Sequence, residues 1–233
     1  MIVLGIETAA VICSVGIARG EQIIGEIRLA VKNIHAEVLT ATIRDLLALL
    51  NLPFTALDGI AVSIGPGSFT GLRIGLATAK GLAFSLGKPL VSIDTLQSQA
   101  TAVASTNGFI VPVLRARQNE VYAARYHATG GELDQVEPAA VFSLTEFAKW
   151  LEPPAVLCGN GVSMLASAGL LDGKKGIEVI PEIACPLSGG KIAELGMRRL
   201  QRGEVDDAAM LEPRYVQEFM RSPKSISKTP GQR

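Results

Sequence analysis

The order of the predicted elements occurs twice along this chain of 233 residues. In each half, three short stretches with strand-like patterning precede a helix, a further strand, a glycine loop and a second helix. The halves agree in this order but not in their residues, so the pattern indicates a duplicated architecture rather than a sequence repeat. Two α/β lobes, each with a mixed β-sheet flanked by helices, fit this order best.

The elements of the first half are predicted from hydrophobic spacing and turn residues. A short turn at 19–21 favours an antiparallel hairpin between the second and third strands. The opening residues lack a cationic stretch and include Glu7, which predicts a first strand and not a signal peptide. The expected strands cover 2–8, about 11–18, 22–29, 59–64 and 89–93, and the expected helices about 34–50, 72–86 and 95–105.

The second half repeats this order and ends in a polar tail. Its expected strands cover 109–114, 120–128, 132–142 and 155–158, and its helices 144–150, a short one after the glycine loop at 159–161, and 188–202. The last helix can pack on either lobe. We expect an N-terminal lobe with partner-binding helices over 1–106, a C-terminal lobe over 107–220, and a disordered basic tail over 221–233.

The composition argues against several classes of protein. Lys and Arg together number 22, as do Asp and Glu, so the formal net charge is zero. Proteins that bind nucleic acid by themselves usually carry a basic excess, so we expect at most a supporting role beside a basic partner. No stretch predicts a membrane span. Cys13, Cys158 and Cys185 form no CxxC pair, which predicts buried free thiols in a reducing cytoplasm.

The run GPGSFTGLRIG, Gly65–Gly75, lies between a predicted strand and a predicted helix, where a phosphate-binding loop would sit. No lysine follows its glycines as in a Walker A loop, and Gly71 comes one residue late for a dinucleotide fingerprint. Pro66 also lacks a backbone N–H donor. Two interpretations stay open: a tight turn that docks a helix closely on a sheet, or a vestigial phosphate site built from Gly65, Gly67, Ser68, Thr70, Gly71, Glu7 and Thr8.

The helix expected after this loop is apolar nearly all round. Its charges over 72–86 are Arg73 and Lys80, which lie on one side. Small residues recur every four positions and predict a smooth ridge for close contact: Gly71, Gly75, Ala79 and Ala83. Such a helix must be covered on more than one face. We expect either an internal pair with the 34–50 helix or a subunit interface at His35, Val38, Leu39, Thr42, Arg73, Gly75, Leu76, Ala79, Lys80 and Ala83.

The sequence contains few recognisable catalytic groups. The two histidines, His35 and His127, form neither an HxxxH nor an HExxH pair, and Ser68 lacks a Gly-x-Ser-x-Gly elbow and a visible base. Glu7 with Thr8 resembles the acid-and-hydroxyl corner with which actin-like ATPases hold metal and phosphate, and Asp94 ends another predicted strand. We expect no catalytic residue and no metal site.

Several stretches together resemble one family. The glycine run resembles the signature of the TsaB (YeaZ) family, a subunit of the bacterial complex that makes N6-threonylcarbamoyladenosine (t6A37) in tRNA. Further matches are the opening at 3–8 and 13–17, His35 with Glu37, Ala116 and Arg117 with 120–122, the GNG loop at 159–161, and 212–215. The sequence departs from the family pattern at four positions: Glu7 for Asp, Ala36 for Ser or Thr, Arg115 for Asp, and Gln217 for Arg.

The resemblance implies an actin-like (ASKHA) fold in two lobes without a working ATP site. In this family the catalytic relative TsaD carries the metal-binding histidines, and any nucleotide or metal belongs to TsaD. TsaB-like chains pair with TsaD through the helices after the first β-unit and after the glycine loop, the ATPase TsaE assists, and a chain without its partner forms a homodimer on the same surface. The resemblance thus implies a cytoplasmic, non-catalytic subunit that activates TsaD and reaches tRNA indirectly.

Two other functions stay open at this point. A self-sufficient actin-like ATPase or kinase would need to bind nucleotide near Glu7 and the loop at 65–71. A glycopeptidase-like peptidase would need a zinc-ligand pair or a nucleophile with its base, and neither is visible in the sequence.

Overall fold

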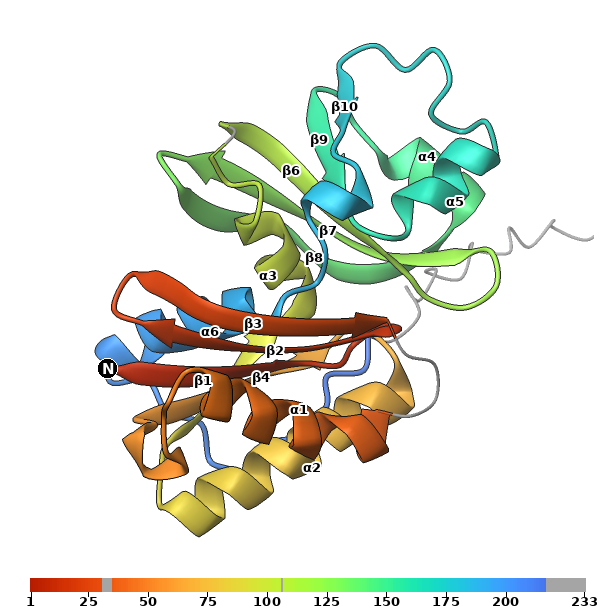
Figure 1. Ribbon diagram of the computed structural model, residues 1–233. Coiled ribbons are helices and arrows are strands. Elements are labelled where there is room, and N and C mark those ends of the chain that lie inside the picture. The colour runs from red at the N-terminus through yellow and green to blue at the C-terminus, as the bar shows by residue number, and fades with distance from the viewer. Residues whose placement is uncertain (31–34, 106, 217–233) are drawn as a thin grey trace, which may run out of the picture.

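The computed structural model describes residues 1–30, 35–105 and 107–216, which form two lobes stacked on each other (Figure 1). The N-terminal lobe contains a five-stranded sheet with the order β3-β2-β1-β4-β5. Its strands are β1 (Ile2–Glu7), β2 (Ile12–Arg19), β3 (Gln22–Ala30), β4 (Gly59–Gly65) and β5 (Leu90–Asp94). The β1–β2 and β2–β3 pairs are antiparallel, whereas β1–β4 and β4–β5 are parallel. The sheet is therefore mixed, as predicted.

Helices cover both faces of this sheet. Helices α1 (His35–Leu49) and α2 (Phe69–Leu86) lie on one face, and α6 (Gly189–Gln201) lies on the other (Figure 1). The backbone of α6 approaches β1 and β2 so closely that a Cβ on Gly5 or Gly16 would overlap it. The helix expected at 188–202 therefore returns from the second half of the chain to pack on the first lobe, because glycines on both elements permit this contact.

The C-terminal lobe contains a second five-stranded sheet, with the order β10-β9-β6-β7-β8. Its strands are β6 (Gly108–Arg115), β7 (Glu120–Thr129), β8 (Glu132–Ser143), β9 (Ala155–Cys158) and β10 (Ile177–Val179). Along β6, Ile110 and Leu114 pack on one side with α3 (Thr95–Thr101), and Val111 and Val113 pack on the other. This alternation places α3 between the lobes, and α4 (Leu144–Trp150) and α5 (Val162–Ser167) on the outer face.

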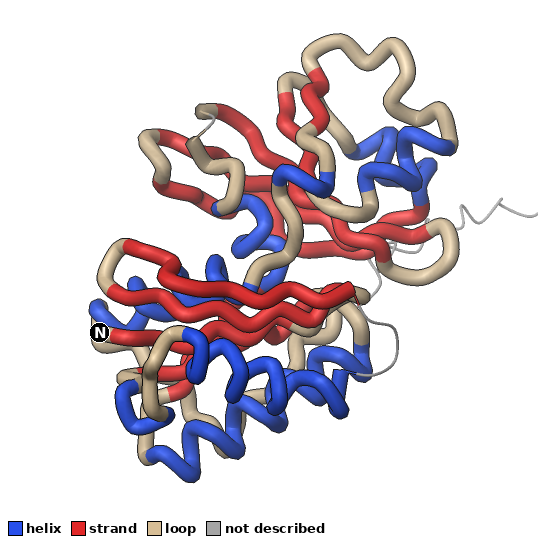
Figure 2. Tube along the Cα trace, in the orientation of Figure 1, coloured by secondary structure: helices blue, strands red, loops and turns tan. Residues whose placement is uncertain are grey.

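The two sheets share one topology, which confirms the predicted duplication of order and the predicted fold class. Each lobe has three consecutive antiparallel strands, and its fourth strand pairs in parallel with the first: β4 with β1, and β9 with β6. The lobes differ in their helices: α1 and α2 are much longer than their counterparts α4 and α5 (Figure 2).

Several boundaries differ from the predictions. Helix α2 begins at Phe69 rather than near 72, because the Ser68 side chain accepts a hydrogen bond from the Gly71 N–H and caps the helix. Helix α3 ends at Thr101 rather than near 105. Strand β10 and the short 3-10 helices η1 (Phe54–Ala56) and η2 (Glu182–Ala184) were not expected. The predicted tail at 221–233 and Gln217 lie outside the described residues.

Two further expectations concern the thiols and the membrane. Cys13, Cys158 and Cys185 are free and buried, as predicted. Within the residues that the structure describes, no helix combines the length and apolar character needed to cross a membrane.

Candidate functional site

The glycine loop joins β4 to α2 and lies against the end of β1. A Cβ on Gly67 would overlap the Ala9 backbone, and one on Gly71 would overlap the Thr8 carbonyl oxygen. The structure therefore brings the predicted residues of the vestigial phosphate site together, with Glu7 directly before Thr8 in the same strand end. Gly65 has a φ of 117°, and a Cβ there would overlap the carbonyl oxygen of Arg214 in the C-terminal segment.

The spaces left by these glycines are filled by the chain itself. The Ser68 N–H donates to the Ala9 carbonyl oxygen at 2.6 Å, and the Gly71 N–H donates to Ser68 Oγ at 3.2 Å. The Arg214 N–H donates to the Ile64 carbonyl oxygen at 2.7 Å. Two donors that a phosphate cradle would use are thus engaged internally. The loop acts as the tight turn of the first interpretation, which docks α2 closely onto the sheet.

Glu7 is closed off from solvent at the end of β1. Its Oε1 accepts hydrogen bonds from the Ala9 N–H at 2.6 Å and from Ser63 Oγ at 2.9 Å. Neither Glu7 Oε2 nor Thr8 Oγ1 has a hydrogen-bond partner among the described residues. Burial raises the pKa of Glu7 from 4.5 to about 7, although the hydrogen bonds act in the opposite direction. The acid-and-hydroxyl corner exists, but it is buried.

Asp94, the second acid at a strand end, forms a helix cap and an ion pair within the fold. Its side chain caps α3 by accepting from the Gln97 N–H at 2.9 Å, and Arg214 Nη1 lies 3.2 Å from its Oδ2. Burial raises the pKa of Asp94, against the lowering effect of the Gln97 hydrogen bond and the Arg214 charge. Asp94 therefore links β5, α3 and the C-terminal segment.

The residues that were considered as metal ligands or as a nucleophile have structural roles where the structure describes them. Within the described ranges, no group of three or more His, Cys, Asp or Glu side chains is placed to hold a metal ion. His127 packs edge-on against Phe109 in the C-terminal sheet, and the side chain of His35 lies outside the described residues. Ser68 Oγ serves as the cap of α2.

Six of the ten predicted interface residues are buried within the chain itself. These are Leu39, Thr42, Gly75, Leu76, Ala79 and Ala83. Gly75 faces Thr8 Oγ1, and the α2 side chains pack with Leu39 of α1 in one core cluster. The ridge of small residues is therefore the inner face of α2 and packs within the chain, and not at the outer surface where a subunit interface would lie. The internal helix pair that we kept as an alternative is confirmed.

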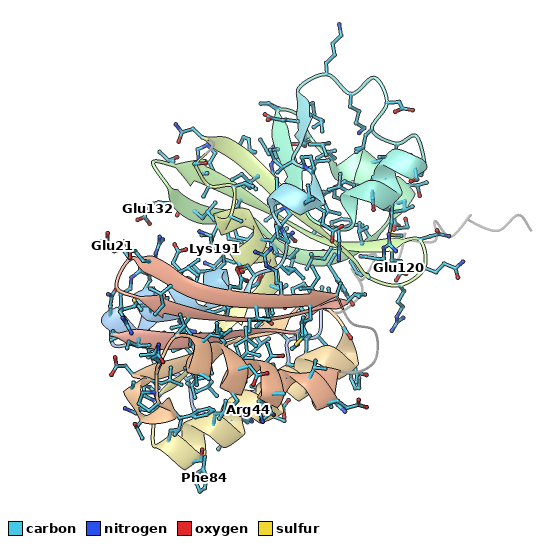
Figure 3. All side chains as sticks on the ribbon, viewed as in Figure 1. Glu21, Arg44, Phe84, Glu120, Glu132 and Lys191 are labelled. Carbon is cyan, nitrogen blue, oxygen red and sulfur yellow. The ribbon has the colours of Figure 1, made fainter. Side chains whose placement is uncertain are left out.

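The outer faces of α1 and α2 are exposed and partly apolar. On α2, exposed residues follow one another at helical spacing: Thr70, Arg73, Ala77, Gly81 and Phe84. Phe84 is 92% exposed and points away from the body of the protein (Figure 3), and Leu49 of α1 is 74% exposed. We call these residues of α2, together with Leu49, the outer helix face. Val38 and Lys80 of the predicted interface are half-buried.

A cleft of about 800 Å³ lies beside the glycine loop and between the lobes. Residues 9–11 and the loop line one side, and residues 115–117, Tyr122 and Asn160 of the second lobe line the other. The C-terminal segment closes one end with Arg214, Tyr215 and Val216. Of these, Phe69, Arg117 and Tyr215 were not predicted as site residues. They come together from distant parts of the sequence, so their spacing gave no signal, although Arg117 and Tyr215 lie in segments that match the family pattern.

Comparisons with known proteins agree with this architecture. A family model described as "TsaD: tRNA N6-adenosine threonylcarbamoyltransferase" matches residues 27–221. The tRNA threonylcarbamoyladenosine biosynthesis protein TsaB of Bacillus subtilis (strain 168) is 30% identical over 167 residues, which cover 70% of this chain and 73% of that protein. The TsaB of Escherichia coli (strain K12) is 32% identical over 128 residues, or 54% of this chain and 55% of that protein.

Solved structures support the same assignment. YeaZ from Pseudomonas aeruginosa has a TM-score of 0.77 and 25% identity, covering 92% of this chain and 99% of that one. More distant structures, 10% to 13% identical with TM-scores of 0.52, share the two-lobed actin-like fold and inform the fold alone. The extent of the family match and the identity to TsaB proteins show that this chain belongs to the TsaB (YeaZ) family.

Proposed function

We propose that this chain is a non-catalytic subunit of the machinery that forms t6A37 in tRNA, where it binds and activates TsaD with the assistance of TsaE. The observation that carries the proposal is the filled glycine loop. Thr8, Ala9 and Arg214 occupy the spaces beside Gly65, Gly67 and Gly71, where a nucleotide phosphate would need room. The names of the TsaB relatives supply the pathway.

The chain itself then needs no cofactor, and any nucleotide or metal belongs to TsaD. The burial of Glu7 and the capping role of Ser68 support this division of labour, because each group already serves the fold. The ATPase and peptidase alternatives would require these same groups to be accessible to a ligand. The buried free thiols fit a reducing cytoplasm as the place of action.

The outer helix face is the surface that we assign to TsaD, and to a second copy of this chain when TsaD is absent. Ala77 and Gly81 lie at its centre, where small side chains allow a partner helix to approach closely, and Phe84 supplies an exposed aromatic anchor. This surface replaces the buried ridge as the site of contact, and Arg73 is the residue common to both descriptions.

The experiment is size-exclusion chromatography of the chain mixed with TsaD. Ala77→Glu should abolish the complex at concentrations where the unmodified chain forms it, since a charge would be buried without a partner. Ala166→Glu introduces the same change at an exposed helical position of the second lobe and should leave the complex intact. Equal complex formation by both variants would show that TsaD does not bind this face.

A calorimetric titration of the chain alone with Mg-ATP separates the proposal from the ATPase alternative. We expect no saturable heat, because the loop donors and the glycine spaces are occupied. Binding at about micromolar affinity, comparable to that of a working nucleotide site, would favour a self-sufficient ATPase.

A further inference from the structure

The cleft between the lobes concentrates positive charge. Arg115 ends β6, Arg117 follows it, and both side chains are exposed. Neither guanidinium forms an ion pair with an acid of the described residues, and no carboxylate from those residues lines the cleft. Arg214 contributes a third guanidinium, which is paired with Asp94. An acid, Glu182, lines the smaller hollow that adjoins the cleft. The local field thus favours an anion although the whole chain is neutral.

The glycine-loop side of the cleft, together with its closed end, presents exposed aromatic rings. Phe69 and Tyr215 stack with their ring centroids 5.2 Å apart, and they are 53% and 47% exposed. Arg73 holds the pair in place, because its guanidinium lies 3.9 Å from the Phe69 ring centroid and its Nε donates to Tyr215 Oη at 3.0 Å. Aromatic rings that are fixed and still half-exposed offer a platform on which a planar base can stack.

We infer that this cleft binds an unpaired stretch of RNA, with bases on Phe69 and Tyr215 and phosphates at Arg115 and Arg117. The inference rests on the proposed function, which makes tRNA the substrate of the complex. The combination of stacking rings with unpaired guanidinium groups favours a single strand over a duplex, whose bases are stacked on each other and hidden from side chains. A mononucleotide is less favoured, because the loop that would hold its phosphates is filled.

The cleft is continuous with the outer helix face. Arg73 belongs to that face and also touches both rings of the platform. An RNA strand in the cleft would therefore pass beside a partner bound to α2. The chain would then contribute directly to substrate binding in the complex, which goes beyond a purely indirect contact with tRNA.

The test is fluorescence anisotropy with a labelled anticodon stem–loop RNA, and with a blunt RNA duplex of equal length as the comparison. The double variant Arg115→Ala with Arg117→Ala should bind the stem–loop about tenfold more weakly. It should also lower the slope of log K against log salt concentration by about 1.4, since each lost single-strand phosphate contact contributes about 0.7 to that slope. Arg19→Ala with Lys175→Ala removes two exposed cations outside the cleft and should bind as the unmodified chain does.

A second variant separates stacking from charge. Tyr215→Leu keeps an apolar side chain but removes the ring, so binding of the stem–loop should weaken while the salt dependence stays unchanged. Equal losses in the two double variants would overturn the inference, as would equal binding of duplex and stem–loop. Displacement of the RNA by ATP at about micromolar concentration would overturn it in favour of a mononucleotide site.

The transfer reaction distinguishes a failure of this inference from a failure of the proposed function. In the assembled complex, Arg115→Ala with Arg117→Ala should raise the KM for tRNA while the complex with TsaD forms normally. An unchanged KM, in a reaction that the unmodified chain still activates, would refute the RNA cleft alone. A reaction that the unmodified chain does not activate would refute the proposed function.

Discussion

The two lobes use their glycine loops in the same way but differ in the helices that follow. In the first lobe, Gly67 and Gly71 pack on the backbone at the end of β1. In the second, Gly159 and Gly161 pack on the end of β6, where the Gly161 N–H donates to the Val113 carbonyl oxygen at 2.9 Å. Each loop therefore fixes the fourth strand and its helix against the end of the first strand of its own sheet.

The lobes differ in the length of the helices that accompany these glycine loops. Helix α2 has 18 residues and α1 has 15, whereas α5 and α4 have 6 and 7. The long pair extends well beyond what the first sheet requires and exposes an outer face that carries Phe84 (Figure 3). The glycine loop is thus a packing element common to both lobes, whereas the outer helix face, which we assign to TsaD, belongs to the first lobe alone.

The largest expected effect comes from filling a glycine space in the first lobe. Gly71→Ala should lower the free energy of unfolding by about 3 kcal/mol, because the new methyl group overlaps the Thr8 carbonyl oxygen. Gly81→Ala on the same helix meets no atom within 4 Å and should raise stability by about 0.5 to 1 kcal/mol. Chemical denaturation followed by circular dichroism measures both. Similar values for the two variants would mean that the loop is open, unlike its counterpart in the second lobe.

An effect of similar size concerns the buried carboxyl group at the end of β1. The pKa of Glu7 is about 7 in the folded protein and 4.5 as its ordinary value, so the folded state holds this proton more tightly. Its contribution to stability should therefore fall as the pH rises from about 4.5 to 7, by about 3 kcal/mol in total.

Glu7→Gln removes the titrating group and isolates this contribution. The difference in unfolding free energy between the variant and the unmodified chain should grow in favour of the variant across that pH range. Denaturation curves recorded at several pH values measure it. A difference in unfolding free energy that stays constant with pH would mean that the Glu7 carboxylate is ionised and exposed to solvent. A metal site at the end of β1 would require that state.

The smallest expected effects come from the side chains that cap the two loops. Ser68→Ala removes the acceptor for the Gly71 N–H, and Asn160→Ala removes the acceptor for the Arg115 N–H at 2.8 Å. Each should cost about 1 kcal/mol, and Ser68→Ala should leave the activation of TsaD unchanged. Loss of TsaD activation in a folded Ser68→Ala protein would give this hydroxyl a chemical role. The loop of the first lobe would then differ in function from the loop of the second lobe.

The sequence predicted the order of the elements along the chain well, because strand alternation and turn residues are local signals, whereas the order of the strands within each sheet came only from the structure. The hairpin turn at 19–21 and the succession of strands along the chain follow from these local signals. For α2, two alternatives stayed open, because periodicity identifies a stripe of small residues but not the neighbour that covers it. Only the fold shows that Gly75 meets Thr8. The stacking of Phe69 on Tyr215 depends likewise on the return of the C-terminal segment, which spacing does not encode.

Threonylcarbamoyl transfer to tRNA by TsaD, TsaE and the adenylate-forming enzyme of the same organism, with and without this chain, tests the central claim most directly. We predict that transfer requires the chain, that the chain alone has no activity, and that Ala77→Glu fails to restore transfer whereas Ala166→Glu restores it. Equal transfer with and without the chain would contradict the assignment as an activating subunit.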